Sequence, residues 1–165
     1  MSKVTWVRIA IWIASALAWP GAAEELAKVP KVFAGAAVAE VLRVRLDKDD
    51  LLLESLMDVL KSHDVVDGAV LTGAGSLSRC TFHGVNSTMT TINEPMELSS
   101  LGGLIADGQP HLHVVLTSKE RGAFGGHLEN GCKVLSHAEI TILKFSGPAL
   151  ARKAAVKDGG VLQLK

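Results

Sequence analysis

The chain has 165 residues, of which 48% are hydrophobic, and its 17 Lys and Arg residues equal its 17 Asp and Glu residues. This length predicts one globular domain, and the balanced charge argues against a basic protein that wraps nucleic acid. Aromatic residues make up 4% of the chain, too few for a surface that stacks nucleic-acid bases. Two cysteines are too few for a disulfide scaffold or an all-thiolate zinc site.

Residues 1–23 predict a secretory signal peptide. A positive start with Lys3 and Arg8 is followed by eleven apolar residues and then by small ones. As a helix, eleven residues rise about 16 Å, roughly half the thickness of a hydrocarbon core, so cleavage is favoured over an uncleaved anchor. The expected cleavage site follows Ala23, with Ala18 as the alternative.

Removing 23 of the 165 residues leaves 142, with 15 basic and 17 acidic side chains. We expect this mature protein to be exported, periplasmic or secreted, with no attachment to a membrane. An oxidising compartment permits a disulfide between Cys80 and Cys132. The sequence does not bring these residues together, so two buried free thiols are the favoured interpretation.

The first elements after the signal peptide are a leader, a strand and a helix. Residues 24–37 show no clear period and predict a leader segment. Apolar and polar residues then alternate over 38–46, which indicates a strand. Apolar residues at helical spacing predict an amphipathic helix over 50–63, with Asp49 and Asp50 as its N-cap and first turn.

Strand and turn signals follow to the end of the chain. Tight turns are expected at 73–76 and 107–108, and the tail 147–165 is weakly patterned. One helix among short strands predicts an α+β fold, a single domain over 38–146 in which an antiparallel sheet packs with one or two helices. The predicted strands cover residues 69–72, 77–85, 97–106, 111–117 and 134–145.

The segment His111-Leu112-His113 carries the sharpest chemical signal. On a strand, side chains two residues apart point to the same face, so the two imidazoles can converge on one metal ion. His127 follows the pair Gly125-Gly126, which would let the backbone bring it back toward the strand. Three histidines with one open position are typical of a catalytic zinc site. The alternative is two solvated strand histidines and an unrelated loop histidine.

Other polar residues are weaker candidates. Glu97 and Glu129 lie near the strands and the His127 turn, so either could transfer protons, although an exposed carboxylate is the commoner case. His83 could contact a metal ligand rather than the metal itself, whereas His63 and His137 are interpreted as a histidine at a helix end and one in the sheet. The glycines of residues 73–76 lack the rest of a phosphate-binding motif, which favours a turn between strands.

Several motifs together resemble the plants-and-prokaryotes-conserved (PPC) domain family. The similarity covers about residues 38–145, with the motifs in the family's order. They are residues 68–77 (GAVLTGAGSL), 97–103 (ELSSLGG), 110–113 (PHLH), 125–128 (GGHL) and 131–132 (GC).

The resemblance implies a compact α+β domain, a homotrimer and a distant likeness to acetolactate decarboxylase, whose zinc is held by a strand HxH and a later histidine. On that likeness His111, His113 and His127 form the metal site. Plant members bind DNA through a separate AT-hook, but this chain has no Arg-Gly-Arg-Pro sequence. Residues 94–98 keep the acidic residue of a plant motif and lack its Arg and Phe.

Three functions are compatible with the sequence. The first is a metal-dependent, lyase-like enzyme acting on a small carboxylate or carbonyl compound, with a divalent metal, zinc first, on the three histidines and Glu97 as the proton-transfer group. The second is a non-catalytic trimeric module of the cell envelope that binds a small molecule or a protein. DNA binding ranks last, because a slightly acidic exported chain is a poor ligand for DNA.

Overall fold

The computed structural model describes residues 30–154 and 162–164. The predicted signal peptide 1–23, residues 24–29 of the predicted leader, and residues 155–161 and 165 of the tail lie outside the described residues. Residues 30–32 belong to an N-terminal unit, and Phe33 begins a second compact unit, with which everything below is concerned. Within the described part of the chain, no helix has the length and apolar character needed to cross a membrane.

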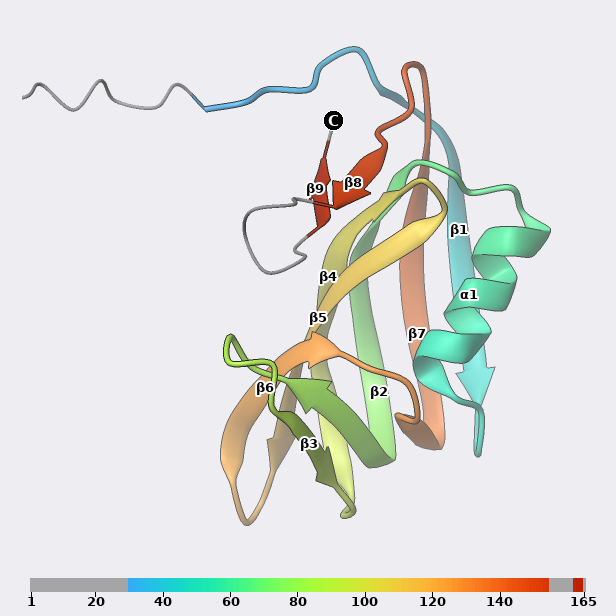
Figure 1. The fold of residues 1–165 in the computed structure, drawn as a ribbon. Helices are drawn as coiled ribbons and strands as arrows, with labels where there is room; N and C mark the ends of the chain where they lie inside the picture. Colours follow the sequence, from blue (N-terminus) through green and yellow to red (C-terminus); the bar gives the residue numbers. More distant parts are fainter. Residues whose placement is uncertain (1–29, 155–161, 165) are drawn as a thin grey trace, which may run out of the picture. The chain divides into compact units, whose positions relative to one another are not determined.

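One antiparallel sheet and one helix make up the fold (Figure 1). The strand order is β1-β7-β2-β4-β5-β6, with β3 beside β2, and two further short strands pair with each other. The fold is therefore a mostly-β form of the α+β class that the sequence predicts. The elements are β1 (Ala37–Asp47), α1 (Leu52–Ser62), β2 (Gly68–His83), β3 (Met89–Ile92), β4 (Met96–Ala106), β5 (Gln109–Ser118), β6 (Gly122–Leu128), β7 (Lys133–Ser146), β8 (Arg152–Ala154) and β9 (Leu162–Leu164).

Strand β2 runs through residues 73–76, so the predicted turn there is wrong. The glycines serve close packing instead. A Cβ on Gly73 would lie 2.9 Å from the Leu101 Cβ, and one on Gly75 would lie 2.4 Å from the His137 carbonyl oxygen. The pairing of β2 with β7 shifts in register along this part of the strand, as is expected where β-bulges bend a strand. The turn at 107–108 is confirmed, because Asp107 and Gly108 both have positive φ between β4 and β5.

The far end of β2 closes the sheet on itself. Its first part pairs with β4, whereas Phe82 and His83 at its end pair with Leu128 and His127 of β6. Strand β6 is therefore held by β5 along one part and by β2 at its end. Strand β6 pairs with β5 from His113 to Ser118, and residues 109–112 of β5 have no partner in β6.

The two faces of the sheet differ in burial. Along β5, Leu112, Val114 and Leu116 are buried, while His111 and His113 between them are exposed. Helix α1 adds its own buried residues Leu52, Leu56 and Leu60 to the same hydrophobic core. The histidine-bearing face therefore looks away from the core.

The expected cap of α1 is wrong. The N-cap is Leu51, and no side chain caps the helix. Asp49 pairs with Lys133 at 2.8 Å, and the Asp50 carboxylate accepts a hydrogen bond from the Asp47 backbone N–H. Both aspartates are used in the turn between β1 and α1, which leaves Glu54 as the acidic residue of the first helical turn.

The two cysteines form a disulfide, so the interpretation as free thiols is corrected. Cys80 on β2 and Cys132 just before β7 have Cα atoms 3.8 Å apart, and both are fully buried. They are 52 residues apart in the sequence, and only the pairing of β2 with β7 brings them together. This proximity is a tertiary contact, which local patterns do not report.

Candidate metal centre

Strand β5 presents two of the three predicted ligands. His111 and His113 lie on its exposed face, and Leu112 between them is 2% exposed and part of the core. Opposite them on β4 are Leu104 and Gly102. The predicted arrangement of two imidazoles on one face of a strand is therefore confirmed.

Strand β6 brings His127 to the same place. His127 lies opposite His113 in the β5–β6 pairing and opposite His83 in the β2–β6 pairing. The expected role of the preceding glycines holds, because a Cβ on Gly125 would lie 2.0 Å from the Val114 carbonyl oxygen and one on Gly126 would lie 2.3 Å from that of His83. Only glycine lets β6 approach both neighbours so closely.

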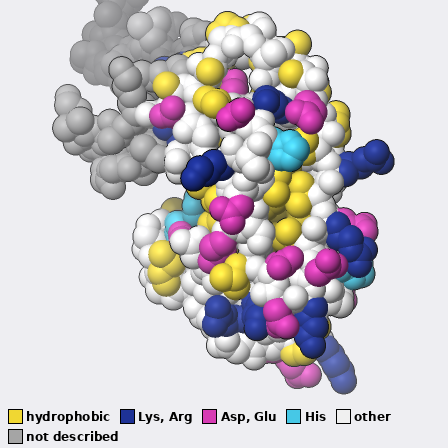
Figure 2. Space-filling view, turned by 90° about the vertical axis from the view of Figure 1, so that its right-hand side faces the viewer, with side chains coloured by type: hydrophobic (Ala, Val, Ile, Leu, Met, Phe, Trp, Pro, Cys, Tyr) yellow, Lys and Arg dark blue, Asp and Glu magenta, His cyan; other side chains and the backbone are white. Residues whose placement is uncertain are grey.

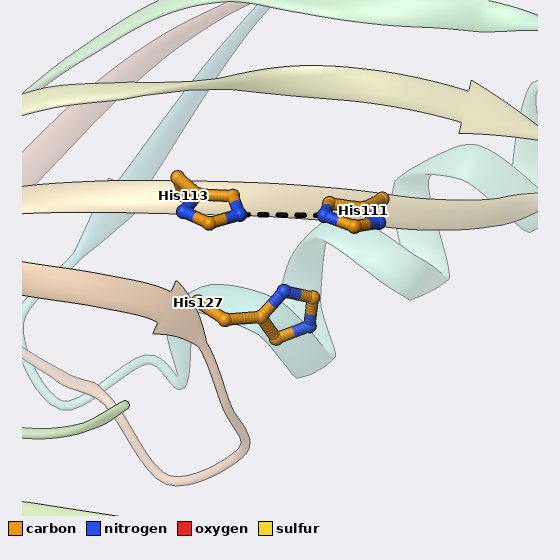
Figure 3. A group of neighbouring side chains, drawn as sticks. All are labelled: His111, His113 and His127. Atoms are coloured by element: carbon orange, nitrogen blue, oxygen red, sulfur yellow. Dashed lines mark hydrogen bonds between the residues drawn. The ribbon is translucent and has the colours of Figure 1, made fainter. Parts of the chain in front are cut away.

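The three side chains converge (Figure 3). One nitrogen from each of His111, His113 and His127 lies within 4.8 Å of the others. The Nε2 atoms of His111 and His113 are 3.3 Å apart. The His127 ring stands edge-on to both, with ring centroids at 4.8 Å from His111 and 5.4 Å from His113. His127 is half-buried and the other two are exposed, so the cluster is open to solvent on one side.

The surroundings favour the neutral form of two of these rings. Burial lowers the pKa of His111 below its usual 6.5, and the nearby charges of Arg152, His113 and His83 lower it further. Burial and then the neighbouring His111 and His83 lower the pKa of His127, partly offset by Glu129. A neutral imidazole offers a lone pair to a metal, whereas an imidazolium does not.

A fourth histidine, His83, packs against His127. The His83 ring lies 4.6 Å from the His127 ring, centroid to centroid. Its Nδ1 is 2.7 Å from the Glu129 carboxylate, and both side chains are about three-quarters buried. This contact orients the His83 ring beside that of His127.

The structure does not bring Glu97 to the cluster. Glu97 is exposed near the start of β4, opposite Thr117 of β5 and Ser76 of β2. Gly102, the β4 residue opposite His113, lies five positions further along the strand, about 16 Å away. Glu129 is the carboxylate that lies beside the histidines. Its signal in the sequence was its position two residues after His127.

Gly126→Ala tests whether the close approach of β6 builds the site. The new methyl group would meet the His83 carbonyl oxygen, so we expect a loss of about 2–3 kcal/mol in unfolding free energy and zinc binding weakened about tenfold or more. Gly122→Ala is the control, since nothing lies within 4 Å of its added Cβ. It carries only the cost of its positive φ, about 1 kcal/mol. Equal zinc affinities in the two variants would contradict this role.

The lowered pKa values predict how pH affects the stability of the metal-free protein. In the unfolded chain both histidines return to a pKa near 6.5 and bind protons at a higher pH than in the folded protein. The unfolding free energy should therefore be unaffected by these groups above pH 6.5 and fall as the pH drops toward their lowered values. Chemical denaturation from pH 8 to 5 in a chelating buffer measures this, and a His111→Gln/His127→Gln variant should show a shallower fall than His137→Gln.

Sequence comparison relates the chain to one family and to two larger proteins. Residues 34–146 match the sequence profile of the Plants and Prokaryotes Conserved (PCC) domain. The chain is 29% identical over 103 residues to the bifunctional protein GlmU of Synechococcus sp. (strain JA-3-3Ab) and 28% over 104 residues to that of strain JA-2-3B'a(2-13). Each match covers 62% of this chain but only 17% and 16% of GlmU, so the chain spans less than a fifth of these relatives.

Solved structures share the fold. A hypothetical protein from Salmonella enterica has a TM-score of 0.72 at 19% identity, over 81% of this chain and 95% of its own. A metal-containing protein from Archaeoglobus fulgidus has a TM-score of 0.68 at 24% identity, over 82% and 99%. A protein from Bacteroides thetaiotaomicron described as a putative DNA-binding protein has a TM-score of 0.68 at 21% identity, over 78% and 94%. At these identities the likeness establishes the fold.

Proposed function

The chain belongs to the Plants and Prokaryotes Conserved domain family, as its motifs predicted, and we propose that it is a metal-binding member of that family. His111, His113 and His127 hold one divalent cation, with zinc as the first candidate. The observation that carries the proposal is the convergence of three imidazole nitrogens within 4.8 Å of one another. A metal-containing protein of the same fold in Archaeoglobus fulgidus supports it.

The distances fit a zinc ion. Zinc binds imidazole nitrogen at about 2.0–2.1 Å in tetrahedral geometry, which places two ligand nitrogens about 3.3–3.4 Å apart. The Nε2 atoms of His111 and His113 already lie 3.3 Å apart. The widest nitrogen separation, at most 4.8 Å, exceeds the tetrahedral value by about 1.5 Å, which a side-chain rotation of His127 can close. Without a metal, the same short distance is a hydrogen bond between the two imidazole rings.

A metal held by three imidazoles keeps one position open, where it would polarise a substrate oxygen or activate water. The chain's own contribution is orientation and proton transfer. Glu129 orients His83 beside His127, so Glu129 replaces Glu97 as the carboxylate best placed to exchange a proton with a bound ligand. The catalytic form of the proposal is a lyase-like reaction on a small carboxylate or carbonyl compound. The alternative is a ligand- or protein-binding module without turnover.

Metal content and turnover test these two forms. Purified protein that is loaded with zinc and dialysed should retain about one zinc ion per chain, as measured by elemental mass spectrometry. Retention of less than one tenth of that amount would overturn the metal site. Zinc-loaded protein is then offered 2-acetolactate and related acids. Release of carbon dioxide that His113→Ala abolishes supports the enzyme, and no release by a zinc-loaded protein supports the binding module.

Export and trimer formation complete the proposal. The Cys80–Cys132 disulfide supports an oxidising compartment, in agreement with the signal-peptide pattern of residues 1–23. The sheet face away from the core exposes Val41, Leu71 and Val115 by 46–60%, an apolar surface that association between subunits would cover. Light scattering of the mature protein should give three times the chain mass, and a monomer at micromolar concentration would contradict the trimer.

DNA binding is the third function, and charge argues against it. On the face seen in Figure 2, Asp and Glu side chains lie among the Lys and Arg side chains, and its described residues form no continuous basic surface. On the sheet, Arg45 pairs with Asp47 and Glu139. Phosphate binding needs unpaired clustered cations. A gel shift at physiological salt that weakens steeply with added salt would reverse this ranking.

A further inference from the structure

The segment that follows the family domain carries an arginine to the histidine cluster. The family match ends at residue 146, and Arg152 begins β8 beyond it. The Arg152 Nη2 donates a hydrogen bond to the Leu104 carbonyl oxygen at 3.2 Å, and Leu104 lies directly opposite His111 in the β4–β5 pairing. The Asp107 backbone N–H donates to the Leu150 carbonyl oxygen at 3.1 Å, which fixes the segment over the end of these strands.

The guanidinium of Arg152 is incompletely satisfied. Its Nε is buried and has no hydrogen-bond partner among the described residues. Within residues 30–154 and 162–164, the ion pairs of the structure involve Arg45, Arg121 and Lys133 together with His83, and none involves Arg152. Its positive charge is felt at the cluster, where it helps to lower the pKa of His111. A guanidinium held in this way prefers a planar oxyanion as its partner.

A mostly apolar cavity begins at the same leucine. Leu104 and Leu150 line a cavity of about 440 Å³ together with Phe33, Phe145 and Pro148, and the buried Asp67 lines it as well. Leu104 thus contacts all three features. Its carbonyl oxygen accepts the hydrogen bond from Arg152, and His111 lies opposite it on β5. Its side chain, 43% exposed, lines the cavity. Leu104 and Leu150 thus offer apolar side chains to a ligand that the arginine binds.

We propose that Arg152 anchors a small organic carboxylate at the metal site, with one carboxylate oxygen toward the guanidinium and the apolar part of the ligand against Leu104 and Leu150. This inference rests on the proposed metal site and names the class of its ligand. A divalent cation on three neutral imidazoles together with Arg152 leaves a surplus of positive charge, which an anionic ligand offsets. The apolar walls favour an aliphatic carboxylate over inorganic phosphate.

Calorimetric titration in chloride-free buffer tests the inference. Zinc is titrated first into wild type, Arg152→Gln, Arg152→Lys and Arg45→Gln, and hexanoate, hexanamide and inorganic phosphate are then titrated into each zinc-loaded protein. Wild type should bind hexanoate and not hexanamide. Arg152→Gln should bind hexanoate about tenfold or more weakly, Arg152→Lys should retain part of the affinity, and Arg45→Gln should match wild type. Zinc affinity should be equal in all four proteins.

The outcomes separate this inference from the metal site. If wild type binds zinc and Arg152→Gln binds hexanoate as tightly as wild type does, the arginine anchor is wrong and the metal site stands. Phosphate binding as tight as hexanoate binding would overturn the apolar part of the ligand class. If wild type binds no zinc, both proposals fail. Melting temperatures of the four proteins, expected within a few degrees of one another because glutamine and lysine keep polar groups at both positions, exclude unfolding as the cause.

Discussion

Replacing His113 with alanine is expected to abolish stoichiometric zinc binding. Structural zinc sites with four ligands contribute roughly 10–16 kcal/mol, about 2.5–4 kcal/mol for each ligand, so the loss of one of three imidazoles should weaken zinc binding by about a hundredfold or more. His113 contributes Nε2 at 3.3 Å from that of His111 and lies directly opposite His127. Competition with a zinc-sensitive dye measures the change in affinity.

The control for this variant is His137→Ala. His137 is exposed on β7 and contacts the Ser136 hydroxyl rather than the histidine cluster, so its removal should leave zinc affinity unchanged. His113→Ala should also remove the increase in melting temperature that zinc gives to wild type. Tight binding of zinc by His113→Ala would show that the metal, where bound, is held elsewhere.

Loss of the disulfide is expected to reduce the stability of the protein by about 4 kcal/mol. The Cys80–Cys132 bond closes a loop of 52 residues, and the entropy that such a loop removes from the unfolded chain corresponds to about 4 kcal/mol at 25 °C. Both cysteines are fully buried, so alanine at both positions also removes some packing. Urea denaturation of the Cys80→Ala/Cys132→Ala variant beside oxidised wild type gives the difference.

A reductant separates the covalent contribution from the packing contribution. Oxidised wild type should unfold at a lower urea concentration when reductant is added, whereas the double-alanine variant should not respond to it. Thiol titration of denatured, unreduced wild type should find no free thiol. Two free thiols per chain in protein from an oxidising compartment would contradict the bond.

Local patterns were sufficient for part of the site. The HxH pair follows from strand periodicity, because alternation along β5 determines that His111 and His113 share a face. The glycines before His127 were informative for the same reason, since a close approach of strands excludes a Cβ. The helix and most strands were likewise marked by the spacing of their apolar residues.

Features that depend on pairing between distant strands could not be read from local patterns. The glycines at 73–76 look like a turn in the sequence, yet they lie within β2 because Leu101 and His137 pack against them. Strand β6 was missed as a strand, since its three glycines weaken the alternation. The contact between His83 and Glu129 depends on the pairing of β2 with β6, and the disulfide on that of β2 with β7. The position of Arg152 depends on its contact with β4.

All three proposed ligands lie on one hairpin, β5–β6, whose strands are joined by a short turn. The contacts of the site are therefore local in the sequence, unlike the pairing of β1 with β7 that completes the sheet. Local contacts form early, before the chain has closed its long loops. A metal ion that binds this hairpin should accordingly increase the rate of refolding, and not only slow the rate of unfolding, in stopped-flow experiments with and without zinc.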